Sequence, residues 1–302
     1  MNPSVTPLRY PGGKSTLINY VENFLIANNI NSDISMVEPF AGSASVTVGL
    51  LRDKKIYNAY INDSDPLIYS FWKTILNYND EFVEMINSID ISLDEWLEYQ
   101  KYLIADPLSK FNQKELALAF LFLNRTSYSG IIKAGPLGGK KQLSKYNISC
   151  RFNKKMIIKK IQFLEQFNDK IEVYNRDGID FMNNILNDNK DIFFYVDPPY
   201  YDVGRVLYRE YFNDQKHIEL SNYLKFIQEQ PWLLSYNNHE FILKLYQNTK
   251  TQTVFLDYHS GNYHKNVKEY VFSNRFLPSY EINIGGNNRI YEGPQKQKKL
   301  LV

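Results

Sequence analysis

Cysteine is almost missing from this sequence, which has one, Cys150, among 302 residues. No internal disulfide can form, and a metal site built from several thiolates is excluded. Histidine is also scarce, with four scattered residues, so the sequence predicts no metal centre. Chemistry that needs a cysteine nucleophile after a proline has no support either, because Cys150 follows Ser149.

Long apolar runs are missing as well. The longest, residues 116–123, is much shorter than the roughly 20 residues that a membrane-spanning helix needs. The first residues also lack a basic segment followed by an apolar one, which a secretion signal requires. We therefore expect a cytoplasmic protein with no membrane partner.

A strong net charge is absent too, since its formal value is only +2. The charge is unevenly distributed, because residues 131–160 contain no aspartate or glutamate. The basic residues of this stretch are Lys133, Lys140, Lys141, Lys145, Arg151, Lys154, Lys155, Lys159 and Lys160. They suit a nucleic-acid phosphate backbone and predict salt-dependent binding, although a solvated helix face would show the same pattern.

Aromatic residues are abundant, with 24 tyrosines and 19 phenylalanines, and several of them fall in the most informative stretch. Residues 192–196 are aromatic or β-branched and predict a fully buried parallel strand. Pro198 has no N–H group and ends this strand, which leaves Asp197 at its carboxyl edge. Ligands of open α/β sheets bind at that edge.

The tetrapeptide 197–200, Asp-Pro-Pro-Tyr, predicts chemistry on an exocyclic amine. Asp197 and nearby backbone carbonyls could accept both hydrogens of the amine, which returns electron density to a nitrogen whose lone pair is otherwise delocalised in its ring. Tyr200 could stack on the same ring if the base has left its duplex. An ordinary strand followed by a proline turn would give the same four residues.

Two glycine turns lie nearer the start of the chain. Gly12 and Gly13 precede a helix predicted to reach residue 27, but a nucleotide phosphate loop is excluded, because that motif needs a glycine where this chain has Leu8. The second turn, residues 39–44, joins a predicted strand to a helix and is small enough for a ligand to lie across its backbone.

The next predicted strand, residues 55–62, leads to Asp63. Asp63 lies about twenty residues after the second glycine turn, a spacing at which a carboxylate can bind ribose hydroxyls. Alternatively, Asp63 caps the helix predicted at 66–76. Residues 80–123 then read as helical, and the glycine-rich residues 124–141 predict a hairpin or a mobile loop.

Strands and helices alternate again after this helical part. Asp177 ends a predicted strand, and the last two strands are expected to form a hairpin. The predicted order is strand 170–176, helix 178–186, strand 192–196, helix 214–229, strand 232–237, helix 239–247, and strands 253–258 and 269–274. We predict one α/β domain from residues 1–71 and 154–284, an insertion at 72–153 and a polar basic tail at 285–302.

Three motifs stand in one order: Pro-Leu-Arg-Tyr-Pro-Gly-Gly-Lys at 7–14, Glu-Pro-Phe-Ala-Gly-Ser at 38–43 and Asp-Pro-Pro-Tyr at 197–200. With the insertion ahead of the third, the chain to about residue 274 resembles the Dam-like (D12 class, α-group) DNA adenine-N6 methyltransferases. The resemblance implies a Rossmann-like S-adenosylmethionine-dependent methyltransferase sheet with an inserted, mainly helical DNA target-recognition domain.

The resemblance also implies roles for individual residues in the pocket for S-adenosylmethionine, which becomes S-adenosylhomocysteine. Asp63 would take the ribose hydroxyls and Asp177 the adenine amine of this cofactor. The implied cofactor site is Tyr10, Gly12, Gly13, Lys14, Glu38, Pro39, Phe40, Gly42, Asp63, Asp177 and Asp197. The residues implied to hold the flipped adenine are Asp197, Pro198, Pro199 and Tyr200.

A second implied set contacts DNA, with Tyr128 as the wedge that fills the place of the departed base. This set is Arg9, Asn124, Arg125, Ser127, Tyr128, Ser129, Lys133, Lys140, Lys141, Lys145 and Arg151. The interior of the predicted hairpin departs from the residues that read GATC in the family at Thr126, at Ser127 and from Ile131 onward, so the resemblance assigns no target sequence.

The sequence therefore predicts a site-specific DNA methyltransferase that moves a methyl group to N6 of a flipped adenine in double-stranded DNA. N4-cytosine methylation uses the same geometry but more often has serine at position 197, and an inactive DNA-binding regulator is a further alternative. Cytosine C5 methylation is disfavoured because it needs a thiolate. We expect a monomer, associated with the nucleoid through DNA and acting beside a cognate restriction endonuclease.

Overall fold

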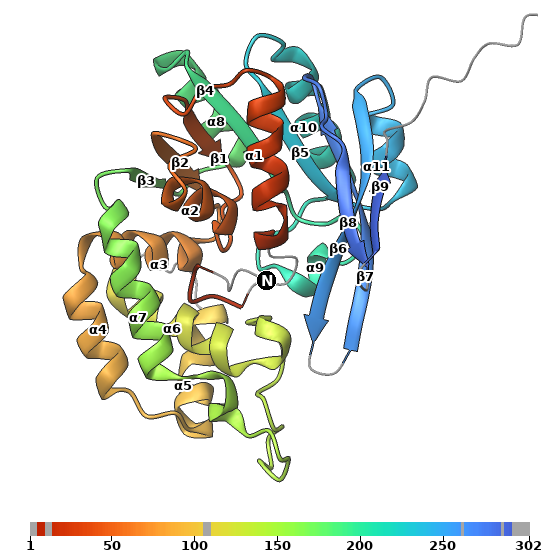
Figure 1. The fold of residues 1–302 in the computed structure, drawn as a ribbon. Helices are drawn as coiled ribbons and strands as arrows, with labels where there is room; N and C mark the ends of the chain where they lie inside the picture. Colours follow the sequence, from red (N-terminus) through yellow and green to blue (C-terminus); the bar gives the residue numbers. More distant parts are fainter. Residues whose placement is uncertain (1–4, 10–13, 105–109, 261–262, 285–286, 292–302) are drawn as a thin grey trace, which may run out of the picture.

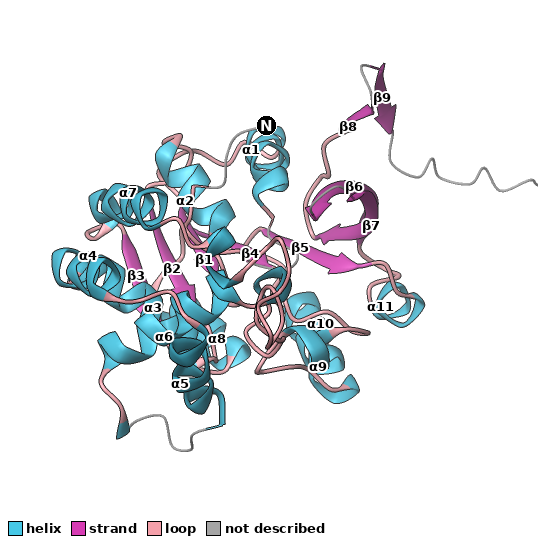
Figure 2. Ribbon diagram, turned by 90° about the horizontal axis from the view of Figure 1, so that it is seen from below, coloured by secondary structure: helices cyan, strands magenta, loops and turns pink. Residues whose placement is uncertain are grey.

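Seven strands form one sheet at the centre of the protein (Figures 1 and 2). The computed structural model describes residues 5–9, 14–104, 110–260, 263–284 and 287–291. The strand order is β3-β2-β1-β4-β5-β7-β6. The strands are β1 Ser35–Glu38, β2 Asn58–Asn62, β3 Ile171–Tyr174, β4 Ile192–Val196, β5 Trp232–Asn237, β6 Lys250–Ser260 and β7 Tyr263–Ser273. β1 to β5 are parallel, and β7 is antiparallel to both β5 and β6, so the predicted Rossmann-like α/β sheet is confirmed.

Side chains of the inner strands alternate between two apolar cores, one on each face of the sheet. Met36 and Phe193 belong to the first core, while Val37 and Phe194 belong to the second. Every residue of β4 is buried, which explains why its sequence is apolar throughout instead of alternating with polar residues. The first face is covered by α1 (Ile18–Ala27) and α2 (Ser45–Arg52), and the second by α8 (Gly178–Asp188), α10 (Asp214–Phe226) and α11 (Glu240–Leu245) (Figure 2).

A group of helices lies between β2 and β3, as the sequence predicts. These helices are α3 Pro66–Asn77, α4 Asn79–Ser88, α5 Leu93–Ile104, α6 Gln113–Thr126 and α7 Lys154–Leu164. The predicted boundary at residue 72 falls inside α3, which packs against α6, and α7 packs against α4. The helices on both sides of the predicted boundaries therefore share one apolar core.

The glycine-rich segment after α6 is a closed loop. The 3-10 helix η3 (Tyr128–Gly130) follows α6, and a single antiparallel bridge joins Ser127 to Pro136. Ser129, Gly130, Gly138 and Gly139 have positive φ angles, which interrupts an extended strand. Of the predicted alternatives, a hairpin or a loop, the described residues form a loop closed by this one bridge, and it continues to the 3-10 helix η4 (Ile148–Arg151).

The last part of the chain adds more strand than the sequence predicts. The hairpin of β6 and β7 is confirmed but is longer than expected. Strands β8 (Tyr280–Ile284) and β9 (Asn287–Tyr291) form a separate two-stranded antiparallel sheet, so the tail predicted from residue 285 begins with a strand, while residues 292–302 lie outside the described residues. Within the described residues no helix is both long and apolar enough to span a membrane.

Candidate active site

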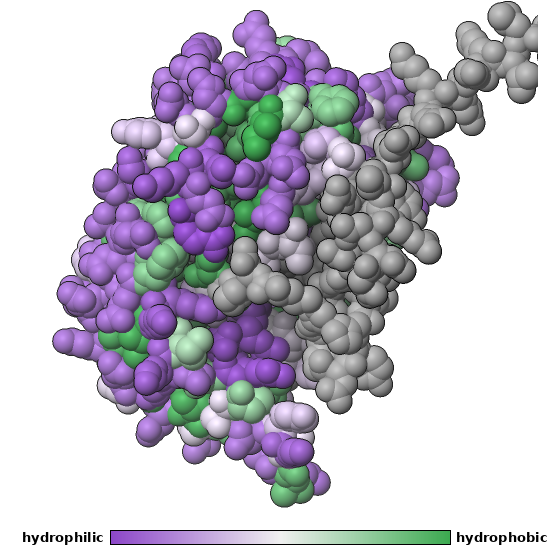
Figure 3. Space-filling model, in the orientation of Figure 1, coloured by the Kyte–Doolittle hydropathy of each residue, from purple (hydrophilic) through white to green (hydrophobic). Residues whose placement is uncertain are grey.

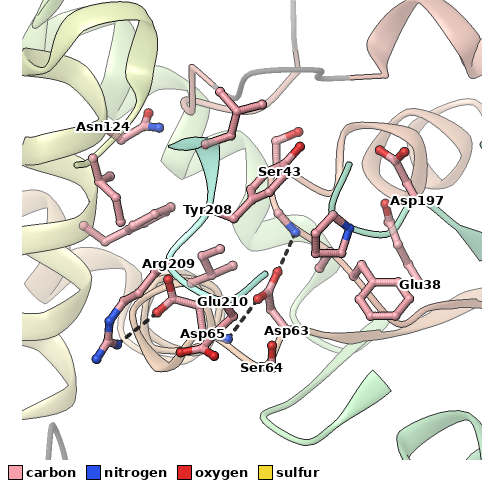
Figure 4. A pocket seen from close by; sticks show the side chains of 18 of the residues that line it. Glu38, Ser43, Asp63, Ser64, Asp65, Asn124, Asp197, Tyr208, Arg209 and Glu210 are labelled. Atoms are coloured by element: carbon pink, nitrogen blue, oxygen red, sulfur yellow. Dashed lines mark hydrogen bonds and ion pairs between the residues drawn. The ribbon is translucent and has the colours of Figure 1, made fainter. Parts of the chain in front are cut away.

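A pocket opens at the carboxyl ends of the parallel strands (Figure 4). Glu38 ends β1, Asp63 follows β2 and Asp197 follows β4, and all three line the pocket. The opposite wall contains Asn124, Gly130 and Ile132 from the helical segment, together with Leu207, Tyr208, Arg209 and Glu210 from the chain beyond the short helix α9 (Gly204–Leu207). The expected gathering of acids at one sheet edge is therefore observed.

The turn between β1 and α2 forms the floor of this pocket, and the backbone holds it tightly. Gly42 has a φ angle of 46°, in the left-handed region that favours glycine. The N–H group of Ala41 donates to the carbonyl of Asn62 at 2.8 Å, and the indole of Trp72 donates to the carbonyl of Gly42 at 3.0 Å. The turn is therefore preorganised, and Phe40 and Gly42 both face the pocket.

Asp63 is fixed at the end of β2 by two backbone donors. Its Oδ2 accepts from the N–H of Gly42 and its Oδ1 from the N–H of Asp65, each at 3.0 Å. Burial, helped by the neighbouring Asp65 carboxyl, raises the pKa of Asp63 to about 7. Asp65 caps α3 by accepting from the N–H of Leu67, so the cap predicted as an alternative for Asp63 belongs to Asp65.

Asp197 has one occupied and one accessible carboxylate oxygen. Lys14 Nζ lies 2.9 Å from its Oδ1, and Ser235 Oγ donates to the same oxygen at 2.8 Å. In the described part of the chain, neither of these partners reaches Oδ2. Burial raises the pKa of Asp197, and the Lys14 ammonium opposes that rise. The side chain is 20% exposed, and it lines the pocket, so Oδ2 is available to a ligand.

Lys14 faces a buried network. Besides Asp197, its ammonium reaches Glu269 Oε2 at 3.3 Å and donates to the hydroxyl of Tyr200 at 2.8 Å. Three acceptors thus surround Nζ, which equals the number of N–H bonds of an ammonium. Lys14 also lines the pocket, as the sequence predicts.

Glu38 is buried behind the pocket, where its carboxyl accepts a hydrogen bond from Thr47. Burial is the main cause that raises the pKa of Glu38 to about 8, and the nearby Asp197 adds a smaller rise. The hydrogen bond from Thr47 opposes them and is weaker than the effect of burial. The Glu38 carboxyl is therefore protonated at neutral pH. Asp197 then has no negative charge from Glu38 beside it.

Phe40 lines the pocket and lies against Gly178, the residue after Asp177. A Cβ atom at Gly178 would lie 2.5 Å from the ring of Phe40, so the glycine permits this close approach. Asp177 caps α8 by accepting from the N–H of Ile179 at 2.9 Å, and Lys216 lies 3.4 Å from its other oxygen. Phe212 contacts Phe40 edge to face, with ring centroids 5.4 Å apart.

The remaining predicted pocket residues are partly outside the described chain. Tyr10, Gly12 and Gly13 lie outside the described residues. The carbonyl of Pro39 accepts from the side chain of Asn62 at 3.0 Å, and Pro199 lines the pocket.

The predicted DNA residues divide into exposed and buried groups. Tyr128 is 65% exposed. Lys140, Lys141, Lys145 and Arg151 are exposed, and the exposed Lys133 donates to the carbonyl of Tyr208 at 2.6 Å. Their loop projects from the lower end of the molecule in Figure 3. Ser129 is partly exposed beside Tyr128.

The buried group contains Asn124 and Ser127, whose side chains are hydrogen-bonded within the protein. The Asn124 amide accepts from the N–H of Arg9 and donates to its carbonyl, each at 2.8 Å, and it also donates to the carbonyl of Gly130 at 3.1 Å. Ser127 accepts from the indole of Trp96 at 3.1 Å. Asn124 thus ties the N-terminal segment to the loop that carries Tyr128.

Two residues of the site escaped the sequence prediction. Glu269 lies on the antiparallel strand β7, where it pairs with Asn237, and Ser235 lies on β5. The available signal was a polar residue inside an apolar strand: Glu269 precedes Tyr-Val-Phe, and Ser235 follows Trp-Leu-Leu.

The parallel sheet, the acids at the ends of β2 and β4, and the Asp-Pro-Pro-Tyr segment define an S-adenosylmethionine-dependent methyltransferase that acts on an exocyclic amine. The family model described as D12 class N6 adenine-specific DNA methyltransferase matches residues 10–259. The chain belongs to this family, and it is a DNA methyltransferase of the N6-adenine class. This assignment selects adenine N6 over the alternative acceptor, cytosine N4.

The chain is also similar to two other methyltransferases. The Type II methyltransferase M.MjaIII of Methanocaldococcus jannaschii is 24% identical over 266 residues, which cover 80% of this chain and 87% of that protein. Among solved structures, the rRNA methyltransferase aviRa from Streptomyces viridochromogenes is similar at a TM-score of 0.39 and 12% identity, covering 87% of this chain and 85% of that one.

Proposed function

We propose that Asp197 and Tyr200 hold a flipped adenine while the pocket along Phe40, Gly42 and Asp63 holds the methyl donor. The observation that carries this proposal is the asymmetry of the Asp197 carboxylate. Its Oδ1 is fixed by Lys14 and Ser235, so Oδ2 can accept from the adenine amine without first breaking a bond. Acceptance at this oxygen stabilises the positive charge that develops on N6.

The residues present fit S-adenosylmethionine, which supplies an electrophilic methyl group on a positively charged sulfur. Besides the protonated Glu38, the pocket has carboxyl groups at Asp63, Asp65, Asp197 and Glu210 against the two cations Lys14 and Arg209, a balance that suits a cationic ligand. Asp63 keeps lone pairs for a ribose diol, since each of its oxygens accepts one backbone hydrogen bond. We assign to Phe40, which lines the pocket, and to Asp177 the contacts with the adenine of this ligand.

We further propose that the exposed loop after α6 and the cations beside it bind duplex DNA. Burial and then repulsion from Arg151 lower the pKa of Arg9. Burial and then repulsion from Arg9 lower the pKa of Arg125 to about 10. Burial and then repulsion from Arg125 also lower the pKa of Lys160. Arg151 contributes to the repulsion on both arginines. Cations held together in this way are stabilised by a bound phosphate.

The helices between β2 and β3 would then form the target-recognition part, with Tyr128 inserted where the adenine has left. We also propose that the enzyme acts as a monomer in the cytoplasm, bound to the nucleoid, and protects DNA from a cognate endonuclease. The Type II methyltransferase relative supports that setting.

The assignment of Asp197 is tested with Asp197→Ala. We expect N6-methyladenine to fall at least 100-fold in DNA from cells that express the variant, because the acceptor of the amine is gone, while calorimetry still detects S-adenosylmethionine binding. Sequencing with detection of modified bases measures the methylation and also reveals the target sequence. Asp191→Ala, an exposed aspartate just before the same strand, is the matched control. Near-normal methylation by Asp197→Ala would overturn the assignment.

A further inference from the structure

Glu269 is a fully buried carboxylate that no sequence motif marks. It lies on β7, an antiparallel strand beyond the parallel sheet, and its side chain is 0% exposed. Burial of an ionised carboxylate is unfavourable unless it is paired and hydrogen-bonded. Its two oxygens meet this requirement, because Oε1 accepts from the Tyr200 hydroxyl at 2.6 Å and Oε2 lies 3.3 Å from Lys14 Nζ.

The hydrogen bonds around Tyr200 have a single consistent direction. Lys14 can only donate, so the Tyr200 oxygen accepts from it at 2.8 Å and donates its own proton to Glu269. The ring is therefore held at its hydroxyl end by a cation and an anion. The edge of Tyr208 also packs against it, with ring centroids 6.3 Å apart. This anchoring fixes the orientation of the aromatic face that the proposed function assigns to the flipped base.

Glu269 also contacts Lys14, the ion-pair partner of Asp197. Lys14 lies between the two carboxylates, 2.9 Å from Asp197 and 3.3 Å from Glu269. Without the second carboxylate, the flexible lysine side chain would lose one of its two negatively charged partners. Glu269 therefore connects the amine acceptor and the stacking ring through Lys14.

We propose that Glu269 is a positioning residue of methyl transfer, which holds Lys14 and the Tyr200 hydroxyl so that Asp197 and the Tyr200 ring are aligned before the adenine enters. The inference rests on the proposed roles of Asp197 and Tyr200. It assigns to the antiparallel strand β7 a part in the reaction, although Glu269 itself does not line the pocket.

The principal test is Glu269→Gln, which keeps the shape and an oxygen acceptor but removes the charge. A hydrogen bond to a charged group contributes about 1.5–3 kcal/mol, so we expect kcat to fall roughly 10- to 100-fold. The affinity for S-adenosylmethionine, measured by calorimetry, should change less than about threefold, because the lost charge lies behind Lys14. Glu172→Gln, an exposed glutamate on β3, should retain wild-type kcat.

Two further readouts separate positioning from a merely structural role. Glu269 contributes to the raised pKa of Asp197, so the acidic limb of the kcat profile should move to lower pH in Glu269→Gln. Tyr200→Phe should reduce kcat by a smaller factor in the Glu269→Gln background than in the wild type, because Glu269→Gln already weakens the charge-assisted hydrogen bond that Tyr200→Phe removes.

The outcomes are distinguishable from failure of the proposed function. If wild-type protein makes no N6-methyladenine, the proposed function fails before Glu269 is considered. If the wild type is active, a Glu269→Gln variant with kcat within twofold of wild type and an unmoved acidic limb overturns the inference. Additive effects of Tyr200→Phe and Glu269→Gln would also overturn it, because they would show that the glutamate does not act through the phenol.

Discussion

At the scale of single residues, the site depends on which carboxyl groups are charged. Asp197 lies 2.9 Å from the Lys14 ammonium, whereas Glu38 at the end of the neighbouring strand is kept protonated by its burial. Sequence patterns predicted both acids, because each directly follows a recognisable strand. They could not predict the protonation, since it depends on Thr47 and on the depth of burial in the folded protein.

Replacement of Glu38 by glutamine should change how stability depends on pH. The pKa of Glu38 is about 8 in the folded protein and has its ordinary value of 4.5 when unfolded. Between these values only the unfolded chain releases the proton, so Glu38 lowers the unfolding free energy by about 1.4 kcal/mol per pH unit as pH rises. Glu38→Gln should lack this contribution. Urea unfolding at pH 5, 6 and 7 measures it, and parallel curves for the two proteins would contradict the raised pKa.

At the scale of helices and strands, local patterns predicted most elements, and the errors arise where distant segments meet. β4, α3 and α8 match their predicted ranges closely, because buried runs, Pro66 and the Asp177 cap are local signals. The position of β7 between β5 and β6 is set by pairing with residues far away in the sequence. This pairing, which brings Glu269 to the site, cannot be read from one stretch of sequence.

The junction of β3 and α8 gives a prediction for the cofactor pocket. An alanine at position 178 would place its Cβ 2.5 Å from the ring of Phe40, so the ring must shift. We expect Gly178→Ala to raise KM for S-adenosylmethionine several-fold, with kcat near wild type once the cofactor is saturating. Steady-state kinetics with radiolabelled donor measure both constants. Gly135→Ala, where an added Cβ meets nothing within 4 Å, should leave cofactor affinity unchanged, and the two variants should not behave alike.

At the scale of the whole molecule, the pocket lies between the sheet edge and the helical segment, and the basic loop projects beyond it (Figures 1 and 3). The sequence predicted a basic surface from residues 131–160, but it did not predict that Asn124 and Ser127 would face inward. Their burial follows from packing of α6 against α3 and α5, which no single segment encodes.

Removal of Arg151 should weaken DNA binding in a salt-dependent manner. Each neutralised phosphate contributes about 0.9 to the slope of log affinity against log salt on duplex DNA, so Arg151→Ala should lower that slope by roughly this amount. Fluorescence anisotropy with a labelled duplex at several salt concentrations gives the slope. Lys190→Ala, an exposed lysine just before β4, is the control at the opposite edge of the sheet. Equal slopes for wild type and Arg151→Ala would exclude a phosphate contact.

The bond between Lys14 and Glu269 joins a residue near the beginning of the chain to one near its end. During synthesis on the ribosome, Lys14 emerges early, and its second carboxylate partner is made only after every parallel strand. A nascent chain that stops before β7 can therefore build most of the sheet but lacks the complete network behind Asp197. Full alignment of the reacting groups must wait until translation of this strand is finished.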